Sequence, residues 1–156
     1  MPGKKRILIV SSIGLTALII FLCLFSNNRY FFNPVFYKKD KITYLPWTLY
    51  KNPMSIEYNS LDLNSTDGLK TIKIMNNQEI KVVFDELKKS QQISEYDDKN
   101  SRLLNEIIIR PSDGSVDLDI FISADGKFAQ VKSTNTFVKL TNKLTELVNK
   151  RMKETK

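Results

Sequence analysis

The sequence predicts an α+β protein in which an N-terminal single transmembrane helix is followed by one outer domain with an antiparallel sheet and two helices. Three observations predict it: an uncharged apolar run, several segments of alternating polarity between Asp-Gly turns, and two segments of helical periodicity. The expected boundaries are a basic cytoplasmic tail at 1–6, a transmembrane anchor at 7–25, an aromatic juxtamembrane stalk at 26–41 and an extracytoplasmic α+β domain at 42–156.

The apolar run at 7–25, ILIVSSIGLTALIIFLCLF, contains no charged residue. A helix of that length spans about 28 Å, close to the thickness of a bilayer's hydrocarbon core. Lys4, Lys5 and Arg6 precede the run, and no acidic residue occurs before Asp40. Positive charge beside a membrane helix favours the cytoplasmic side. We therefore expect a single-pass protein of the cell membrane, with its N-terminus cytoplasmic and its C-terminal domain extracytoplasmic.

Two other interpretations of the apolar run are open. A cleaved signal peptide has a shorter apolar core and ends in a small-x-small motif. Here Leu24 occupies a position that such a cleavage site reserves for a small residue. A lipid-modified Cys23 would require Gly or Ala just before it, where Leu22 stands. We interpret Cys23 as a thiol buried in an apolar environment as a small hydrophobic group.

Composition limits what the outer domain can be. About 130 residues remain outside the anchor, enough for one compact domain. Cys23 is the only cysteine, so the outer domain has no disulfide and no thiolate metal site. The formal net charge is +7, of which three charges lie in the tail, and the segment 139–156 alone accounts for the remaining excess. A basic end suits an anionic envelope polymer, whereas its simplest interpretation is a solvated helix face. No basic stripe alternates with aromatic residues, so nucleic acid is not expected as a partner.

The stalk is rich in aromatic residues, among them Tyr30, Phe31 and Phe32. Aromatic rings prefer the headgroup level of a membrane, where one end can be apolar and the other hydrated. We therefore predict these residues to lie at the membrane interface. A docking surface for a neighbouring membrane protein is the alternative.

The outer domain alternates strand and helix signals. The segment from Asn76 to Glu79 has the pattern of an N-terminal capping pair and predicts a helix at 77–90. Thr141 is expected to cap a closing helix whose inner face carries Leu144, Leu147 and Val148. Strands are expected at 55–63, 69–75, 103–110, 115–123, 127–133 and 136–139, the first two forming a hairpin through a turn at 65–68 and the next three a meander.

The chain contains no histidine, which removes the commonest general base and the commonest zinc ligand. No catalytic, cofactor-binding or metal-binding residues are predicted. Asp117, Asp119 and Phe121 lie two apart on one strand and so share a face, with Asp113 and Asp125 in the flanking turns. We predict Asp117, Asp119 and Phe121 as a candidate interaction surface, with Phe121 either covered by the closing helix or the Trp47 segment or forming part of a binding surface. Paired carboxylates can also serve a metal-dependent hydrolase.

The strand-helix order at 72–87 and the Asp-Gly meander at 107–131 resemble those of small membrane-anchored extracytoplasmic proteins of Gram-positive bacteria, including the YhfM-like lipoproteins. The resemblance covers under half of the chain and implies no functional residue, and the chain lacks their lipobox.

The sequence therefore predicts a membrane-anchored extracytoplasmic binding or accessory module that is not an enzyme. Its expected partners are the membrane together with another membrane protein, contacted through the stalk, or an envelope polymer, contacted through the basic C-terminus. The alternatives are a carboxylate-based metal-dependent hydrolase and an immunity-type membrane protein.

Overall fold

The structure is a computed structural model that describes residues 2–61, 68–94, 102–115 and 117–154, without the side chains of 2–12 and 26–27. Its α-helices are α1 (Pro2–Arg29), α2 (Asn77–Lys89) and α3 (Asn142–Glu154), and short 3-10 turns occur at Trp47–Leu49 and Lys132–Thr134. Its strands are β1 (Met54–Leu61), β2 (Leu69–Ile74), β3 (Gln91–Ile93), β4 (Leu103–Pro111), β5 (Leu118–Ser123), β6 (Phe128–Val131) and β7 (Thr136–Lys139).

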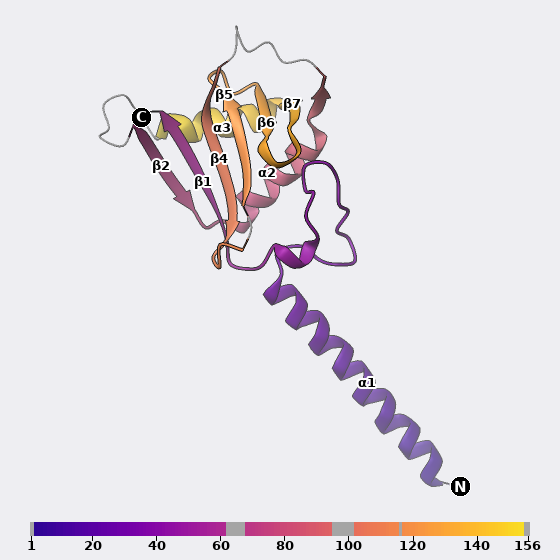
Figure 1. The fold of residues 1–156 in the computed structure, drawn as a ribbon. Helices are drawn as coiled ribbons and strands as arrows, with labels where there is room; N and C mark the ends of the chain where they lie inside the picture. Colours follow the sequence, from indigo (N-terminus) through magenta and orange to yellow (C-terminus); the bar gives the residue numbers. More distant parts are fainter. Residues whose placement is uncertain (1, 62–67, 95–101, 116, 155–156) are drawn as a thin grey trace.

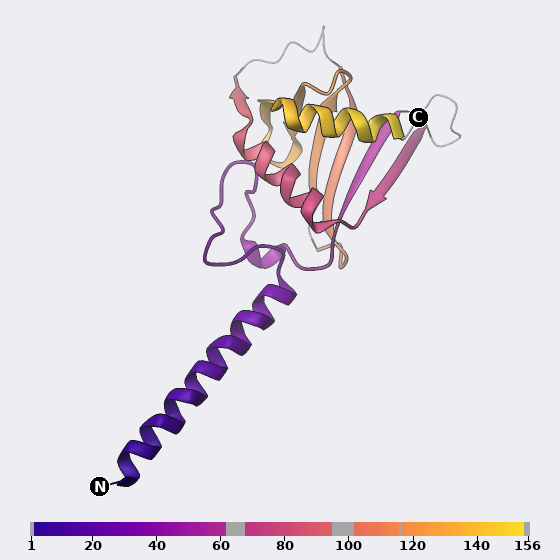
Figure 2. The ribbon, with the colours of Figure 1, turned by 180° about the vertical axis from the view of Figure 1, so that it is seen from behind.

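The strands form one seven-stranded sheet in the order β2-β1-β4-β5-β6-β7-β3, and all the described pairs are antiparallel. Consecutive strands β4 to β7 make a meander, while β1 joins β4 and β3 joins β7 across long stretches of chain. Both α2 and α3 lie against the same face of the sheet (Figures 1 and 2). None of the described helices lies over the opposite face.

The sequence pattern explains which face the helices cover. Alternate residues of each central strand are apolar, and alternate side chains of a strand point to one face. On β5 these residues are Leu118, Ile120 and Ile122, each at most 1% exposed. The helices supply the other half of the core with the side chains of Ile80, Val83, Phe84, Leu87, Leu144, Val148 and Met152.

Both predicted helices of the domain are confirmed, together with their caps. The Asn76 side chain accepts hydrogen bonds from the backbone N–H of Gln78 (2.9 Å) and Glu79 (3.3 Å). The Thr141 hydroxyl accepts one from the N–H of Leu144 at 3.2 Å. The α+β content and the antiparallel sheet also agree with prediction, and β1 and β2 pair as expected. Of their predicted turn at 65–68, only Gly68 lies within the described residues.

The predicted membrane anchor requires correction. Over the described part of the chain, no helix is both long enough and apolar enough to cross a membrane. The structure therefore does not support the single transmembrane helix at 7–25, the single-pass topology or the cell-membrane localisation.

The helix α1 extends away from the domain as a separate rod (Figures 1 and 2). Its apolar side chains, for example Ile13 at 65% and Phe21 at 62%, are exposed. The chain joins the domain directly after it, where the backbone N–H of Asn52 donates to the Arg29 carbonyl oxygen at 2.9 Å.

The segment predicted as a stalk is packed onto the domain. The N–H of Phe31 donates to the Tyr50 carbonyl oxygen at 2.8 Å, and the Phe31 side chain is only 6% exposed. The rings of Phe32 and Tyr50 both pack edge-to-face on Phe84 of α2, with centroids 5.0 and 5.5 Å away. Edge-to-face packing of this kind adds to area burial. The aromatic residues that follow α1 thus extend the core over the end of α2.

Candidate functional site

The face of the sheet opposite α2 and α3, which we call the open face, carries the predicted interaction residues. Along β5, β6 and β7 the side chains on this face alternate with buried ones. One row crosses all seven strands in register and consists of Thr71, Asn59, Glu106, Phe121, Gln130, Phe137 and Ile93. On β5 and β7 the row carries the aromatic residues Phe121 and Phe137, on either side of Gln130 of β6, and on β2, β1 and β4 it is polar.

Phe121 lies on the open face and is half-buried. The closing helix α3 does not cover Phe121, because α3 lies on the opposite face of the sheet. Trp47 packs on Tyr30, with ring centroids 4.7 Å apart. The ammonium group of Lys132 lies 5.6 Å from the Phe121 ring centroid. A cation over an aromatic face is an attractive contact, so Phe121 is shielded on this side by a charged and movable side chain.

Both predicted aspartates are ion-paired. The Asp119 carboxylate accepts a hydrogen bond from Lys132 Nζ at 3.1 Å, which raises the pKa of Lys132. Asp117 lies 3.4 Å from Arg110 Nε, and Arg110 also lies 3.4 Å from Glu57. On the open face Asp117 and Asp119 are thus paired with cations from neighbouring segments, while Glu106, the direct partner of Phe121 on β4, accepts a hydrogen bond from Asn59 at 3.0 Å.

The two turn aspartates do not join this group. Asp113 lies before β5 and Asp125 after it, so the six residues of the strand separate them by about 20 Å. Hydrogen bonds from Ser115 and Lys51 lower the pKa of Asp113 to about 2. Burial raises the pKa of Asp125, but hydrogen bonds from Ser123 and the Lys127 N–H outweigh it. Among the described residues, no group of three His, Cys, Asp or Glu side chains could hold a metal ion.

The predicted membrane-interface residues lie elsewhere. Phe31 and Phe32 belong to the aromatic core beside α2, and Tyr30 packs on Trp47. The three residues thus lie near the junction of α1 with the domain.

A largely buried ion pair joins the two helices that cover the sheet, and no pattern in the sequence indicates it. The guanidinium of Arg151 on α3 donates to the Glu79 carboxylate on α2 through Nε (3.0 Å) and Nη2 (2.5 Å). Tyr58 of β1 donates to the same carboxylate at 2.8 Å. In the sequence Arg151 lies among Lys150 and Lys153 and has the pattern of a solvated helix face. Only the fold shows that its side chain points toward α2.

Comparison with protein-family models, with curated proteins and with solved structures finds no match to this chain.

Proposed function

We propose that this chain is a non-catalytic binding module that holds a protein partner on its open face, through the β5–β7 part of the sheet. The observation that carries the proposal is that half-exposed Phe121 and Phe137 flank Gln130 in one cross-strand row, on a sheet face that none of the described helices covers.

The chemistry of this surface suits a protein partner. Interfaces between proteins combine an aromatic centre with a polar, solvated rim. Here Phe121 and Phe137 form the centre, and the Asp119–Lys132 pair and Lys139 border it. Lys132 is 58% exposed, so a partner's carboxylate can reach it without breaking a buried contact.

The arrangement of carboxylates favours binding over hydrolysis. A hydrolase built on Asp117 and Asp119 needs carboxylates that converge on a substrate or a metal ion. In this structure Asp117 is directed to Arg110 and Asp119 to Lys132, and Asp113 and Asp125 lie at opposite ends of β5. The charges therefore serve to order the face and to select a complementary partner.

Site-directed photocrosslinking tests the proposal. The full-length chain is produced in its native cells with p-benzoylphenylalanine in place of Phe121, and in a matched variant in place of Phe36. Phe36 is also a phenylalanine, is 79% exposed and lies in the segment that precedes Trp47. We expect a discrete protein adduct from position 121 that is absent from position 36 and is weakened by Asp119→Lys. No adduct at 121, or the same adducts from both positions, would contradict the proposal.

A further inference from the structure

One layer of the helix-covered face departs from the apolar pattern of the rest of the core. At the level of Tyr58, the paired residues across β4 and β5 are Ile107 and Ile120, and all are at most 1% exposed. Two residues further along β1, the position facing the helices is Ser60, and its direct partner on β4 is Asn105. A hydroxyl and a carboxamide thus occupy positions where packing alone selects apolar side chains.

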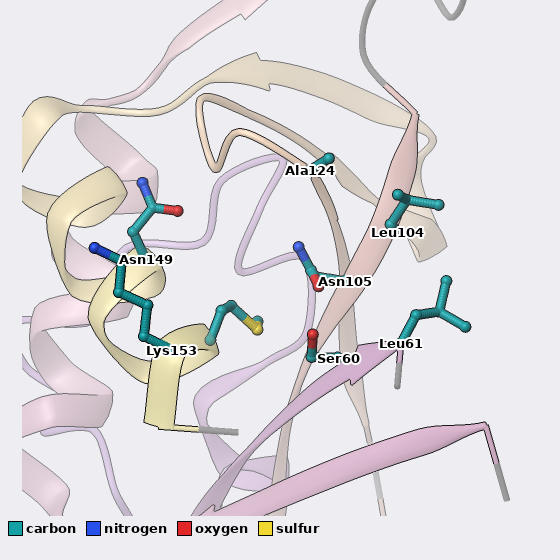
Figure 3. A pocket seen from close by; sticks show the side chains of 8 residues that line it. Ser60, Leu61, Leu104, Asn105, Ala124, Asn149 and Lys153 are labelled. Atoms are coloured by element: carbon teal, nitrogen blue, oxygen red, sulfur yellow. The ribbon is translucent and has the colours of Figure 1, made fainter. Parts of the chain in front are cut away.

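These two polar residues border a cavity under the C-terminal half of α3. The cavity has a volume of about 300 Å³, at the lower end of the range for small-molecule sites. It is lined by Ser60, Leu61, Leu104, Asn105, Ala124, Asn149, Met152 and Lys153. Figure 3 shows Asn105 and Asn149 on opposite sides of it, one on the sheet and one on the helix, with Ser60 below.

The side chains that face this cavity are uncharged. In Figure 3 the leucine side chains point away from α3, on the far side of the strands, and the Lys153 amine points away from Ser60 and Asn105. None of the eight lining residues is acidic. The hydroxyl and carboxamide groups, with Met152 and Ala124 as apolar neighbours, therefore define the chemistry of the site.

The polar groups of the sheet are available to a ligand. Within the described part of the chain, neither the Ser60 hydroxyl nor the Asn105 carboxamide makes a side-chain hydrogen bond, although Ser60 is only 4% exposed. Neither group is among the described polar atoms that are fully buried without a partner, so both reach the open volume of the cavity, where a ligand can replace water. A hydroxyl and a carboxamide that face an open cavity are placed to donate to, or accept from, a molecule bound in it.

Asn149 is held in position by the turn between β5 and β6. Its Nδ2 donates to the Asp125 carbonyl oxygen at 3.3 Å. Gly126 has a φ of +70°, and a Cβ atom at this position would lie 2.6 Å from Asn149 Oδ1, so the close approach needs glycine. With its NH₂ group engaged by the turn, Asn149 offers its carbonyl oxygen as an acceptor.

We propose that this cavity binds a small uncharged molecule that carries an amide group. The amide N–H of the ligand donates to Asn149 Oδ1, its carbonyl oxygen accepts from Asn105 or Ser60, and its methyl or Cα side lies on Met152 and Ala124. An acetamido sugar and a peptide unit both supply this chemistry. The site lies on the opposite face of the sheet from Phe121 and is independent of the proposed protein interface.

Titration of the ¹⁵N-labelled full-length chain, followed by NMR, tests the proposal and separates the two sources of the amide. The probes are N-acetylglucosamine, N-acetylalanine methylamide and, as a control without an amide, glucose. We expect saturable shifts of the Asn105 and Asn149 side-chain NH₂ signals with one amide probe or both, and none with glucose. In Asn105→Leu, the Asn149 side-chain NH₂ signal no longer shifts with either amide probe. Absence of saturable shifts with both amide probes, equal shifts with glucose, or shifts that persist in Asn105→Leu would overturn the proposal.

A pair of asparagine variants shows whether Asn105 has a structural role instead. Asn59 is the residue beside Ser60 on β1 but points to the open face, where it donates to Glu106 at 3.0 Å and accepts from Thr71 at 2.7 Å. We expect Asn59→Leu to lower Tm and to keep the probe shifts, and Asn105→Leu to lose the shifts with Tm unchanged or raised. A fall of Tm in Asn105→Leu as large as in Asn59→Leu would assign Asn105 to the fold and contradict the ligand site.

Discussion

The ion pair between Arg151 and Glu79 is expected to be the most costly polar contact to break in the domain. The Glu79 side chain is 10% exposed and the Arg151 side chain 22%. Replacing Arg151 with Met keeps the length of the side chain but removes both of its hydrogen bonds to the carboxylate. Glu79 is then left nearly buried with Tyr58 as its remaining donor.

Breaking a buried ion pair by removing one partner costs about 3–5 kcal/mol. Because Arg151 is partly exposed and Tyr58 still donates to Glu79, we expect the lower end of that range, about 3 kcal/mol. This is a large part of the free energy of unfolding of a typical domain, about 5–15 kcal/mol. The loss is measured by urea unfolding of the wild-type chain and Arg151→Met, with the m-value used to check that both unfold alike.

Lys73→Met is the matched control. Lys73 pairs with Glu57 at 3.0 Å but is 55% exposed, so its loss should cost no more than about 1 kcal/mol. The double variant Arg151→Met/Glu79→Gln should recover part of the loss, because the uncompensated charge is gone. A cost for Arg151→Met within the range of the Lys73 control would refute the reasoning that this pair is buried and structural.

Three further predictions concern the same fold. Burial raises the pKa of Glu79, but hydrogen bonds from Arg151 and Tyr58 outweigh it and hold the pKa below its ordinary value of 4.5. The stability that this carboxylate contributes is therefore present above pH 4.5 and is lost as the pH falls through the lowered pKa. Urea unfolding at a series of acidic pH values should show that acid lowers the free energy of unfolding less in Glu79→Gln than in the wild-type chain. Equal pH profiles of the two chains would contradict this prediction. Asn76→Ala removes the cap of α2 and should cost about 1 kcal/mol by urea unfolding, whereas an unchanged stability would mean that the cap is dispensable. Phe84→Ala should cost about 3–5 kcal/mol, measured in the same way, and a cost under about 1 kcal/mol would contradict the aromatic core formed with Phe32 and Tyr50.

Local signals in the sequence predicted much of the fold because they depend on residues close together in the chain. The capping pattern at Asn76 and the spacing of apolar residues after it placed α2 within a residue of its observed ends. Alternation of Leu118, Ile120 and Ile122 identified β5, although the strand begins at Leu118 and not at 115. The pairing of β1 with β4 and of β3 with β7 joins segments far apart in the chain, so no local pattern indicates it.

The parts that could not be predicted depend on tertiary contacts. Phe31 and Phe32 follow α1 and have the composition of a membrane-interface belt, yet the fold packs them against Phe84. For the candidate site, period-2 alternation placed Asp117, Asp119 and Phe121 on one face, but their cations come from β4 and from the turn after β6. The polar residues Ser60 and Asn105 lie in segments that read as ordinary strands, and only the register makes them a pair.

Carboxylate footprinting of the open face tests the central claim most directly. The full-length chain is labelled with a carbodiimide and an amine, once in intact native cells and once after purification, and the labelling of each aspartate is measured by mass spectrometry. Asp117 is 41% exposed on the open face, and Asp85 is an exposed aspartate on α2, away from that face. If a partner occupies the open face, labelling of Asp117 falls in cells relative to the purified chain while that of Asp85 does not change. Equal labelling of Asp117 in both states, or an equal fall at Asp85, would contradict the account.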